Sequence, residues 1–122
     1  MLKIIVGGQV DKDKIAALIK KIGGDQVTVT VKSDIAAAMA IKTGQQDYYI
    51  GACLTGGGGA LAMAIALLGL GNCATLSMPG NIRSEAEIIK EVQAGKKAFG
   101  FTAQHAEQVL PVLMKELLAR TK

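Results

Sequence analysis

The segment Asp47 to Gly59, DYYIGACLTGGGG, determines how the rest of the sequence is interpreted. It begins with a strand-like apolar run, Tyr48 to Ala52, followed by the polar turn Cys53-Leu54-Thr55. Four consecutive glycines, Gly56 to Gly59, then lead into the apolar segment Ala60 to Leu70. This order is typical of a strand, a glycine-rich loop and a helix.

The glycine-rich loop is a candidate anion site. Glycine has no Cβ and reaches positive φ at little cost, so the backbone can approach a ligand closely. The first N–H groups of the following helix have no partner inside the helix, and with the helix dipole they suit an anion. The candidate ligand-binding residues of this loop are Thr55, Gly56, Gly57, Gly58 and Gly59. In the alternative interpretation, Thr55 is only a helix cap and the glycines only allow tight packing of the helix on the sheet.

The loop does not have the features of a nucleotide site. It lacks the Lys-Ser/Thr ending of a P-loop, and it follows a later strand than a dinucleotide fingerprint would. No CxxC spacing is present, so the sequence predicts no zinc site, and no other metal or cofactor is expected.

Composition predicts a single α/β domain over residues 1–122. Half of the residues are apolar but only 3% are aromatic, which is typical of a parallel sheet between helices. The formal charge is +4, but the lysines are spread over several segments. With few aromatic side chains to stack on bases, nucleic acid is not an expected partner.

The cysteines and the apolar segments favour a cytoplasmic protein. Cys53 and Cys73 suggest no disulfide framework, and Met1 leads directly into a strand, so no signal peptide is expected. Residues 48–82 carry no charge. However, the continuous apolar run, Ala60 to Leu70, is about half of the ~20 residues that a membrane span needs. We therefore expect a buried helix and no membrane segment.

Five strand-like segments alternate with five helix-like segments. The expected strands are residues 2–6, 26–32, 48–52, 73–78 and 98–101. In the second helix, Ile35, Ala38 and Met39 form the expected inward stripe. The alternation predicts a three-layer αβα sandwich with a five-stranded parallel sheet, in the flavodoxin-like order 2-1-3-4-5.

In that order the chain reverses between strands one and three, so ligands should bind at the carboxyl ends of these strands. There Gly7, Gly8 and Gln9 would meet the segment that begins at Cys53. Two further candidates follow later strands at the same edge.

These two candidates are Arg83, which suits a phosphate contact, and His105, the only histidine. The alternatives are a solvated arginine and a surface histidine.

Two long stretches resemble a known family. MAIKTGQQDYYIGACLTGGGGALAMAIA at residues 39–66 and KKAFGFTAQHAEQVLP at residues 96–111 are similar to the corresponding parts of the YhfU family of small bacterial proteins. The resemblance extends over the length of the sequence. It implies no particular chemistry, because no activity is established for that family.

A second resemblance is local. Cys53-Leu54-Thr55-Gly56-Gly57-Gly58 is similar to the Cys-Gly-Thr-Gly-x-Gly loop of ribose-5-phosphate isomerase B and galactose-6-phosphate isomerases. The resemblance implies that Cys53 would be the base, and that the Gly56 to Gly58 amides would hold an enediolate oxygen. Two features depart from these isomerases: Gly7-Gly8-Gln9 replaces their Asp-His pair, and Ala64-Ile65 stands where they have Asn-Lys. In the alternative interpretation, Cys53 is only a small apolar side chain.

Three functions remain open from the sequence. The first is binding of a small phosphorylated or carboxylated ligand at the glycine-rich loop, the second is aldose-ketose isomerase-like activity, and the third is a non-catalytic interaction subunit. The helix at residues 60–70 is apolar around its circumference, so we expect it to be covered in a homodimer. Its large apolar residues are Leu61, Met63, Ile65, Leu67, Leu68 and Leu70.

Overall fold

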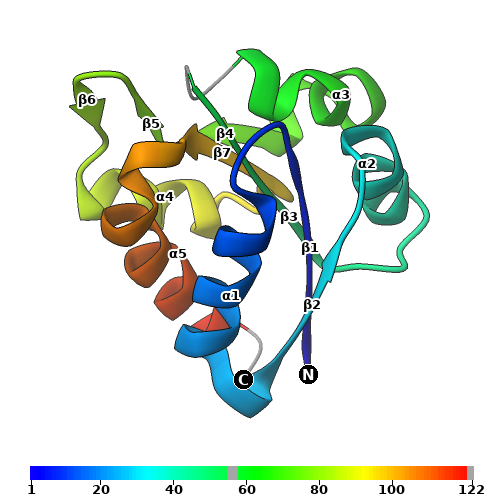
Figure 1. The fold of residues 1–122 in the computed structure, drawn as a ribbon, viewed down its shortest axis with the longest axis horizontal. Coiled ribbons are helices and arrows are strands. Elements are labelled where there is room, and N and C mark those ends of the chain that lie inside the picture. Colours follow the sequence, from blue (N-terminus) through cyan, green and yellow to red (C-terminus); the bar gives the residue numbers. More distant parts are fainter. Residues whose placement is uncertain (55–57, 121–122) are drawn as a thin grey trace.

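The computed structural model describes residues 1–54 and 58–120. A parallel five-stranded sheet forms its centre, in the order β2-β1-β3-β7-β4 (Figure 1). These strands are β1 (Leu2–Gly8), β2 (Val27–Val31), β3 (Tyr48–Cys53), β4 (Cys73–Thr75) and β7 (Ala98–Thr102).

Helices cover both faces of the sheet. Helices α1 (Lys12–Gly23), α4 (Glu85–Gln93) and α5 (Ala106–Arg120) lie on one face, and α2 (Asp34–Lys42) and α3 (Gly58–Leu68) lie on the other (Figure 1). Short 3-10 turns are η1 (Gly24–Gln26), η2 (Leu70–Asn72) and η3 (Ala103–His105). The predicted three-layer αβα sandwich is therefore confirmed.

The predicted order of the last two strands is wrong. The order 2-1-3-4-5 placed the strand at 73–78 beside β3, whereas the structure places β7 there and β4 at the edge. All five residues of β7 are buried, as a central strand of a parallel sheet requires. In contrast, β4 has three residues and ends at the half-buried Thr75, and short strands suit a sheet edge.

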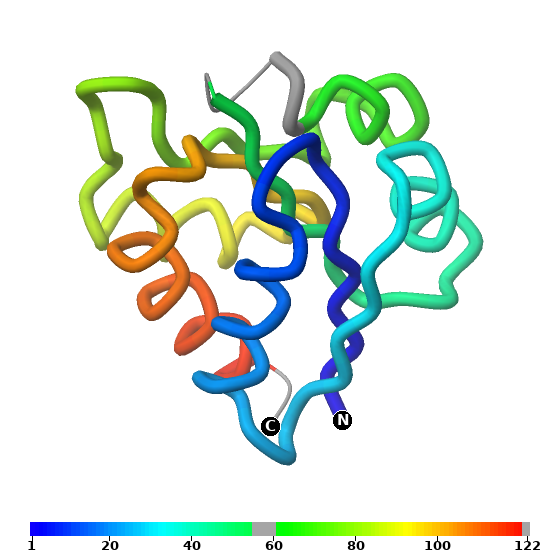
Figure 2. Tube along the Cα trace, viewed as in Figure 1, coloured from blue at the N-terminus to red at the C-terminus, as the bar shows by residue number. Residues whose placement is uncertain are grey.

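The predicted strand at 73–78 divides into two parts. After β4, the segment Ser77–Met78 (β5) pairs antiparallel with Asn81–Ile82 (β6). Gly80, at φ 75, allows the tight turn between them. Figure 2 shows this hairpin at the margin of the molecule, on the side away from α2.

The inward face of α2 also differs from the prediction. Ile35 and Met39 are 57% and 42% exposed, and the buried residues are three alanines, Ala37, Ala38 and Ala40. Small side chains allow α2 to lie close to both α3 and the sheet, which leaves no room for Ile35 or Met39 inside. These two apolar side chains therefore lie on the outer surface of the α2–α3 layer.

Helix α3 is covered on one side only. Leu61 is buried, while Ile65 and Leu67 are half-buried. Just beyond the helix, Leu70 is 72% exposed. Among the described helices, none is both long enough and apolar enough to cross a membrane.

Candidate functional site

Three glycines line up across the centre of the sheet, near the carboxyl ends of the strands. Gly7 of β1 is in register with Gly51 of β3, and Gly51 is in register with Gly100 of β7. The Tyr49 side chain lies over the first two, because a Cβ at Gly7 would come within 2.5 Å of Tyr49 Cε2 and one at Gly51 within 3.0 Å of Tyr49 Oη. Without side chains at Gly7 and Gly51, the ring can lie flat along the sheet.

The Tyr49 hydroxyl is held at the carboxyl edge. The N–H of Gly8 donates to Tyr49 Oη over 3.0 Å. Burial of the ring, and secondly the charge of Asp34, raise the pKa of Tyr49 well above its ordinary value, and the Gly8 hydrogen bond opposes them. Tyr49 is therefore a neutral phenol at physiological pH.

The segment Gly7-Gly8-Gln9 meets the end of β3, as the sequence suggested. Gln9 N–H donates to the carbonyl of Ala52 over 2.9 Å. Gly8 has φ 83, and a Cβ there would lie 2.5 Å from the backbone nitrogen of Ala52. The close approach of two backbones explains why glycine stands at this position.

The glycine-rich loop is only partly within the described chain. Thr55, Gly56 and Gly57 lie outside the described residues, while Gly58 and Gly59 form the first residues of α3. Cys53, the last residue of β3, is 2% exposed and pairs in register with Thr102 of β7.

The hydroxyl of Ser77, in β5, contacts both the end of β7 and the only histidine of the sequence. The backbone N–H of Thr102 donates to Ser77 Oγ over 3.0 Å, and His105 Nδ1 lies 2.9 Å from the same oxygen. Ser77 is 1% exposed. The His105 ring is thus held by a buried hydroxyl. His105 itself is half-buried, so the residue is not fully enclosed.

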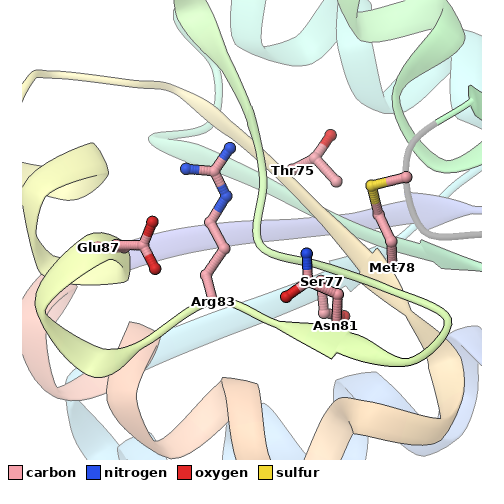
Figure 3. A pocket seen from close by; sticks show the side chains of 6 residues that line it. All are labelled: Thr75, Ser77, Met78, Asn81, Arg83 and Glu87. Atoms are coloured by element: carbon pink, nitrogen blue, oxygen red, sulfur yellow. The ribbon is translucent and has the colours of Figure 1, made fainter.

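A cavity of about 280 Å³ opens beside Ser77. It is lined by Thr75, Ser77, Met78, Asn81, Arg83 and Glu87. In Figure 3, the Arg83 and Glu87 side chains lie on the same side of the cavity, and Met78 lies opposite them. Glu87 Oε1 accepts hydrogen bonds from the N–H and the hydroxyl of Ser84, each 3.1 Å long, and these hydrogen bonds hold the pKa of Glu87 below its ordinary value.

Two polar atoms near this edge are buried without a hydrogen-bond partner in the described part of the chain. One is Thr102 Oγ1, on a residue that is 2% exposed, and the other is Asp34 Oδ1, in the first turn of α2. Over residues 1–54 and 58–120, no group of three or more His, Cys, Asp or Glu side chains could hold a metal ion.

The structure therefore groups the candidate residues along one edge. Arg83 lines the same cavity as Ser77, and His105 contacts Ser77. Cys53 is in register with Thr102, whose N–H also reaches Ser77. Gly7, Gly8 and Gln9 lie further along the edge, beyond β3. The role of Ser77 could not be predicted from the sequence, because a serine between apolar residues carries no local signal of its hydrogen bonds.

Comparison with known proteins identifies the family. The model of the family described as "Protein of unknown function DUF2620" matches residues 2–117. The chain belongs to the DUF2620 family. The curated relatives of this DUF2620 chain include "Uncharacterized protein YhfU" of Escherichia coli strain K12 and of Shigella flexneri. Each is 39% identical over 117 residues, which cover 96% of this chain and 99% of the relative. The predicted resemblance to the YhfU family is confirmed.

Solved structures share the fold of this DUF2620 protein. Ribose-5-phosphate isomerase B of Giardia lamblia matches with a TM-score of 0.72 and 15% identity, over 97% of this chain and 94% of that one. The type B ribose 5-phosphate isomerase of Trypanosoma cruzi matches with a TM-score of 0.69 and 10% identity, over 97% and 85%. At such low identity the likeness establishes the fold alone.

Proposed function

We propose that this DUF2620 protein binds a small anionic ligand, phosphorylated or carboxylated, at the carboxyl edge of the sheet. The observation that carries the proposal is the cavity of about 280 Å³ with Arg83 in its wall. The ligand's anionic group contacts Arg83 and the N–H groups at the start of α3. The predicted loop residues Thr55 to Gly59 and the segment Gly7 to Gln9 complete the proposed site.

The chemistry of the cavity wall supports this proposal. A guanidinium is always charged and presents donors in a fork that matches phosphate or carboxylate oxygens. Thr75, Ser77 and Asn81 add neutral polar groups. Glu87 is the carboxylate of the wall, and its Oε1 accepts hydrogen bonds from Ser84 at the start of α4.

A thermal-unfolding titration tests the proposal. Inorganic phosphate and glycerol 3-phosphate should raise the melting temperature, because a ligand at 100 times its Kd stabilises the folded state by about 2.7 kcal/mol. Arg83→Gln should abolish most of the increase. Arg120→Gln removes an exposed arginine at the far end of α5 and should leave it intact. Equal increases in both variants would exclude Arg83 from the site.

A second candidate is proton transfer in an aldose-ketose isomerisation. The observation that favours it is the position of Cys53 at the end of β3, in a fold shared with ribose-5-phosphate isomerase B. Cys53 would be the base, assisted by the neighbouring glycine-rich loop. Incubation with ribose 5-phosphate in deuterated water should then give exchange at C2, which Cys53→Ala would remove. Binding without exchange would leave the first proposal standing and exclude this one.

We also propose a homodimer that buries the outer surface of the α2–α3 layer. The exposed Ile35 and Met39 of α2 add to the half-buried apolar side chains of the neighbouring α3. Apolar side chains left at the surface are typical of an interface between protein chains, and two-fold dimers are the commonest soluble assemblies. A non-catalytic interaction subunit would use the same surface for another protein. The proposed location is the cytoplasm, in keeping with two buried thiols.

A further inference from the structure

The hydrogen bonds of Ser77 determine which nitrogen of His105 carries the proton. Ser77 Oγ receives the backbone N–H of Thr102 over 3.0 Å and lies 2.9 Å from His105 Nδ1. A backbone N–H can only donate, so this contact occupies one lone pair of the serine oxygen. The hydroxyl proton and one lone pair remain for the contact with His105.

Two arrangements of the His105 contact are conceivable, and they differ in the direction of donation. If Nδ1–H donated to Ser77 Oγ, both oxygen lone pairs would be occupied and the hydroxyl proton would need a third partner. Ser77 is 1% exposed, and the described structure places only these two groups on its oxygen. A buried donor without an acceptor is costly. If Ser77 O–H instead donates to Nδ1, both the proton and the lone pair are used.

We infer that Ser77 holds neutral His105 in the Nε2–H form and that this N–H donates to an oxygen of the bound ligand. The inference rests on the proposed function, since it adds a neutral donor to the anion site. Nε2 lies across the imidazole ring from Nδ1, and His105 is half-buried, so the ring is not fully enclosed. His105 also follows β7 directly, at the carboxyl edge, and contacts Ser77 of the cavity wall without lining the cavity itself.

The inference gives the two residues different roles. His105 contacts the ligand as a hydrogen-bond donor and takes no proton from it. Ser77 is a positioning residue, because its oxygen fixes the ring and its tautomer. A neutral donor at the same edge as the charged Arg83 would orient the oxygens of a phosphate or carboxylate without adding a second full charge.

The tautomer can be measured directly, because His105 is the only histidine in the sequence. Long-range proton–nitrogen correlation spectra of tag-free, ¹⁵N-labelled protein in mildly alkaline buffer should show a pyrrole-like shift at Nε2 and a pyridine-like shift at Nδ1. Ser77→Ala should change this pattern toward the averaged one of free histidine. A protonated Nδ1 in the unmodified protein would overturn the inference.

Two substitutions of His105 distinguish the role of Nε2 in ligand binding from that of Nδ1. The amide nitrogen of glutamine reaches about as far as Nε2, whereas that of asparagine reaches about as far as Nδ1. His105→Gln should keep the affinity for glycerol 3-phosphate within about 3-fold, and His105→Asn should weaken it about 10-fold or more, as expected for loss of a hydrogen bond to a charged group. Equal loss in both variants, at unchanged melting temperature, would show that Nε2–H does not bind the ligand.

The two experiments fail in different ways. If neither phosphate nor glycerol 3-phosphate binds the unmodified protein, the proposed function fails, and the ligand half of this inference fails with it. The tautomer spectrum needs no ligand, so it still decides the role of Ser77. If the ligands bind but the two His105 variants behave alike, only the inference is lost.

Discussion

Tyr49 lies across Gly7 so closely that a Cβ atom on Gly7 would stand 2.5 Å from Tyr49 Cε2. The ring is fully buried and its hydroxyl is held by Gly8, so it cannot move aside freely. Gly7→Ala should therefore destabilise the protein by about 1–3 kcal/mol, as overpacking of a core does. Urea unfolding measures this difference.

Gly71→Ala is the matched control for that substitution. A Cβ at Gly71 would meet nothing within 4 Å, and its φ does not lie in the left-handed range. The unfolding free energy should stay the same or rise by about 0.4–1 kcal/mol, because alanine restricts the unfolded chain. A loss at Gly71 as large as that at Gly7 would mean that the Tyr49 contact is not the cause.

Alkaline pH should destabilise the protein through Tyr49. Burial and Asp34 raise the pKa of Tyr49, so the folded state holds the phenol proton more tightly than the unfolded chain does. The unfolding free energy is therefore insensitive to this group below about pH 10 and falls as the pH rises further. Tyr49→Phe should make this decline of the unfolding free energy with pH shallower, by up to the slope that corresponds to one proton. An unchanged slope in urea titrations above pH 10 would contradict the assignment.

Thr102→Val should not weaken the ligand-free protein. Thr102 Oγ1 is buried, and the described part of the chain offers it no hydrogen-bond partner. Its removal should change the unfolding free energy by less than about 1 kcal/mol, or raise it. Ser77→Ala, in contrast, leaves the Thr102 N–H unpaired and should cost about 1–3 kcal/mol. Thermal unfolding measures the stability of both variants. A larger loss of stability in Thr102→Val than in Ser77→Ala would indicate that Thr102 Oγ1 has a hydrogen-bond partner in the folded protein.

Charge placed on the α2–α3 surface should dissociate the proposed dimer. Ile35→Glu changes a side chain that is 57% exposed, so the protomer should remain folded while the apparent mass halves in light scattering. Leu67→Glu, on α3, should either split the dimer or unfold it, because Leu67 is half-buried. Gln108→Glu adds the same charge to an exposed position of α5 and should leave the mass unchanged. A monomer in the unmodified protein would refute the dimer.

Brief alkylation compares the two cysteines. Burial raises the pKa of the Cys73 thiol, which reduces its thiolate at neutral pH. Cys53 is buried as well, but it lies beside the start of α3, where the helix dipole favours a thiolate, so we expect Cys53 to react faster with iodoacetamide. Mass spectrometry resolves the two sites, and equal or reversed labelling would remove Cys53 from the isomerase proposal.

Local patterns predicted the elements of this fold but not all of their neighbours. Strand-like and helix-like apolar segments, separated by glycines, predicted the five sheet strands and the three layers. The order of β7 and β4 in the sheet was predicted wrongly, because the pairing of strands that are distant in the sequence depends on how deeply each strand is buried. The segment around Gly100 is buried on both faces, while β4 ends at the half-buried Thr75. This exchange places Cys53 beside Thr102 instead of beside the fourth predicted strand.

The candidate site was predictable to a similar extent. The reversal between β1 and β3 pointed to the carboxyl edge of the sheet, and Gly7, Gly8 and Arg83 were proposed as site residues from glycine content and charge. Ser77 was not, because its importance comes from two contacts more than 20 residues away in the sequence, at separations of 25 and 28. Ile35 and Met39 were misplaced because helical periodicity alone could not show that three alanines form the inner face of α2.

The central position of β7 has a consequence for biosynthesis. Within the described sheet, β4 pairs with β7 alone, and the outer edge of β3 is also completed only by β7. A nascent chain that has not yet released β7 from the ribosome therefore exposes two strand edges that cannot pair with each other in the native arrangement. Such edges favour association between chains. The segment that begins at Ala98 thus determines when the sheet can be completed, and fragments ending before Ala98 should aggregate instead of folding partially.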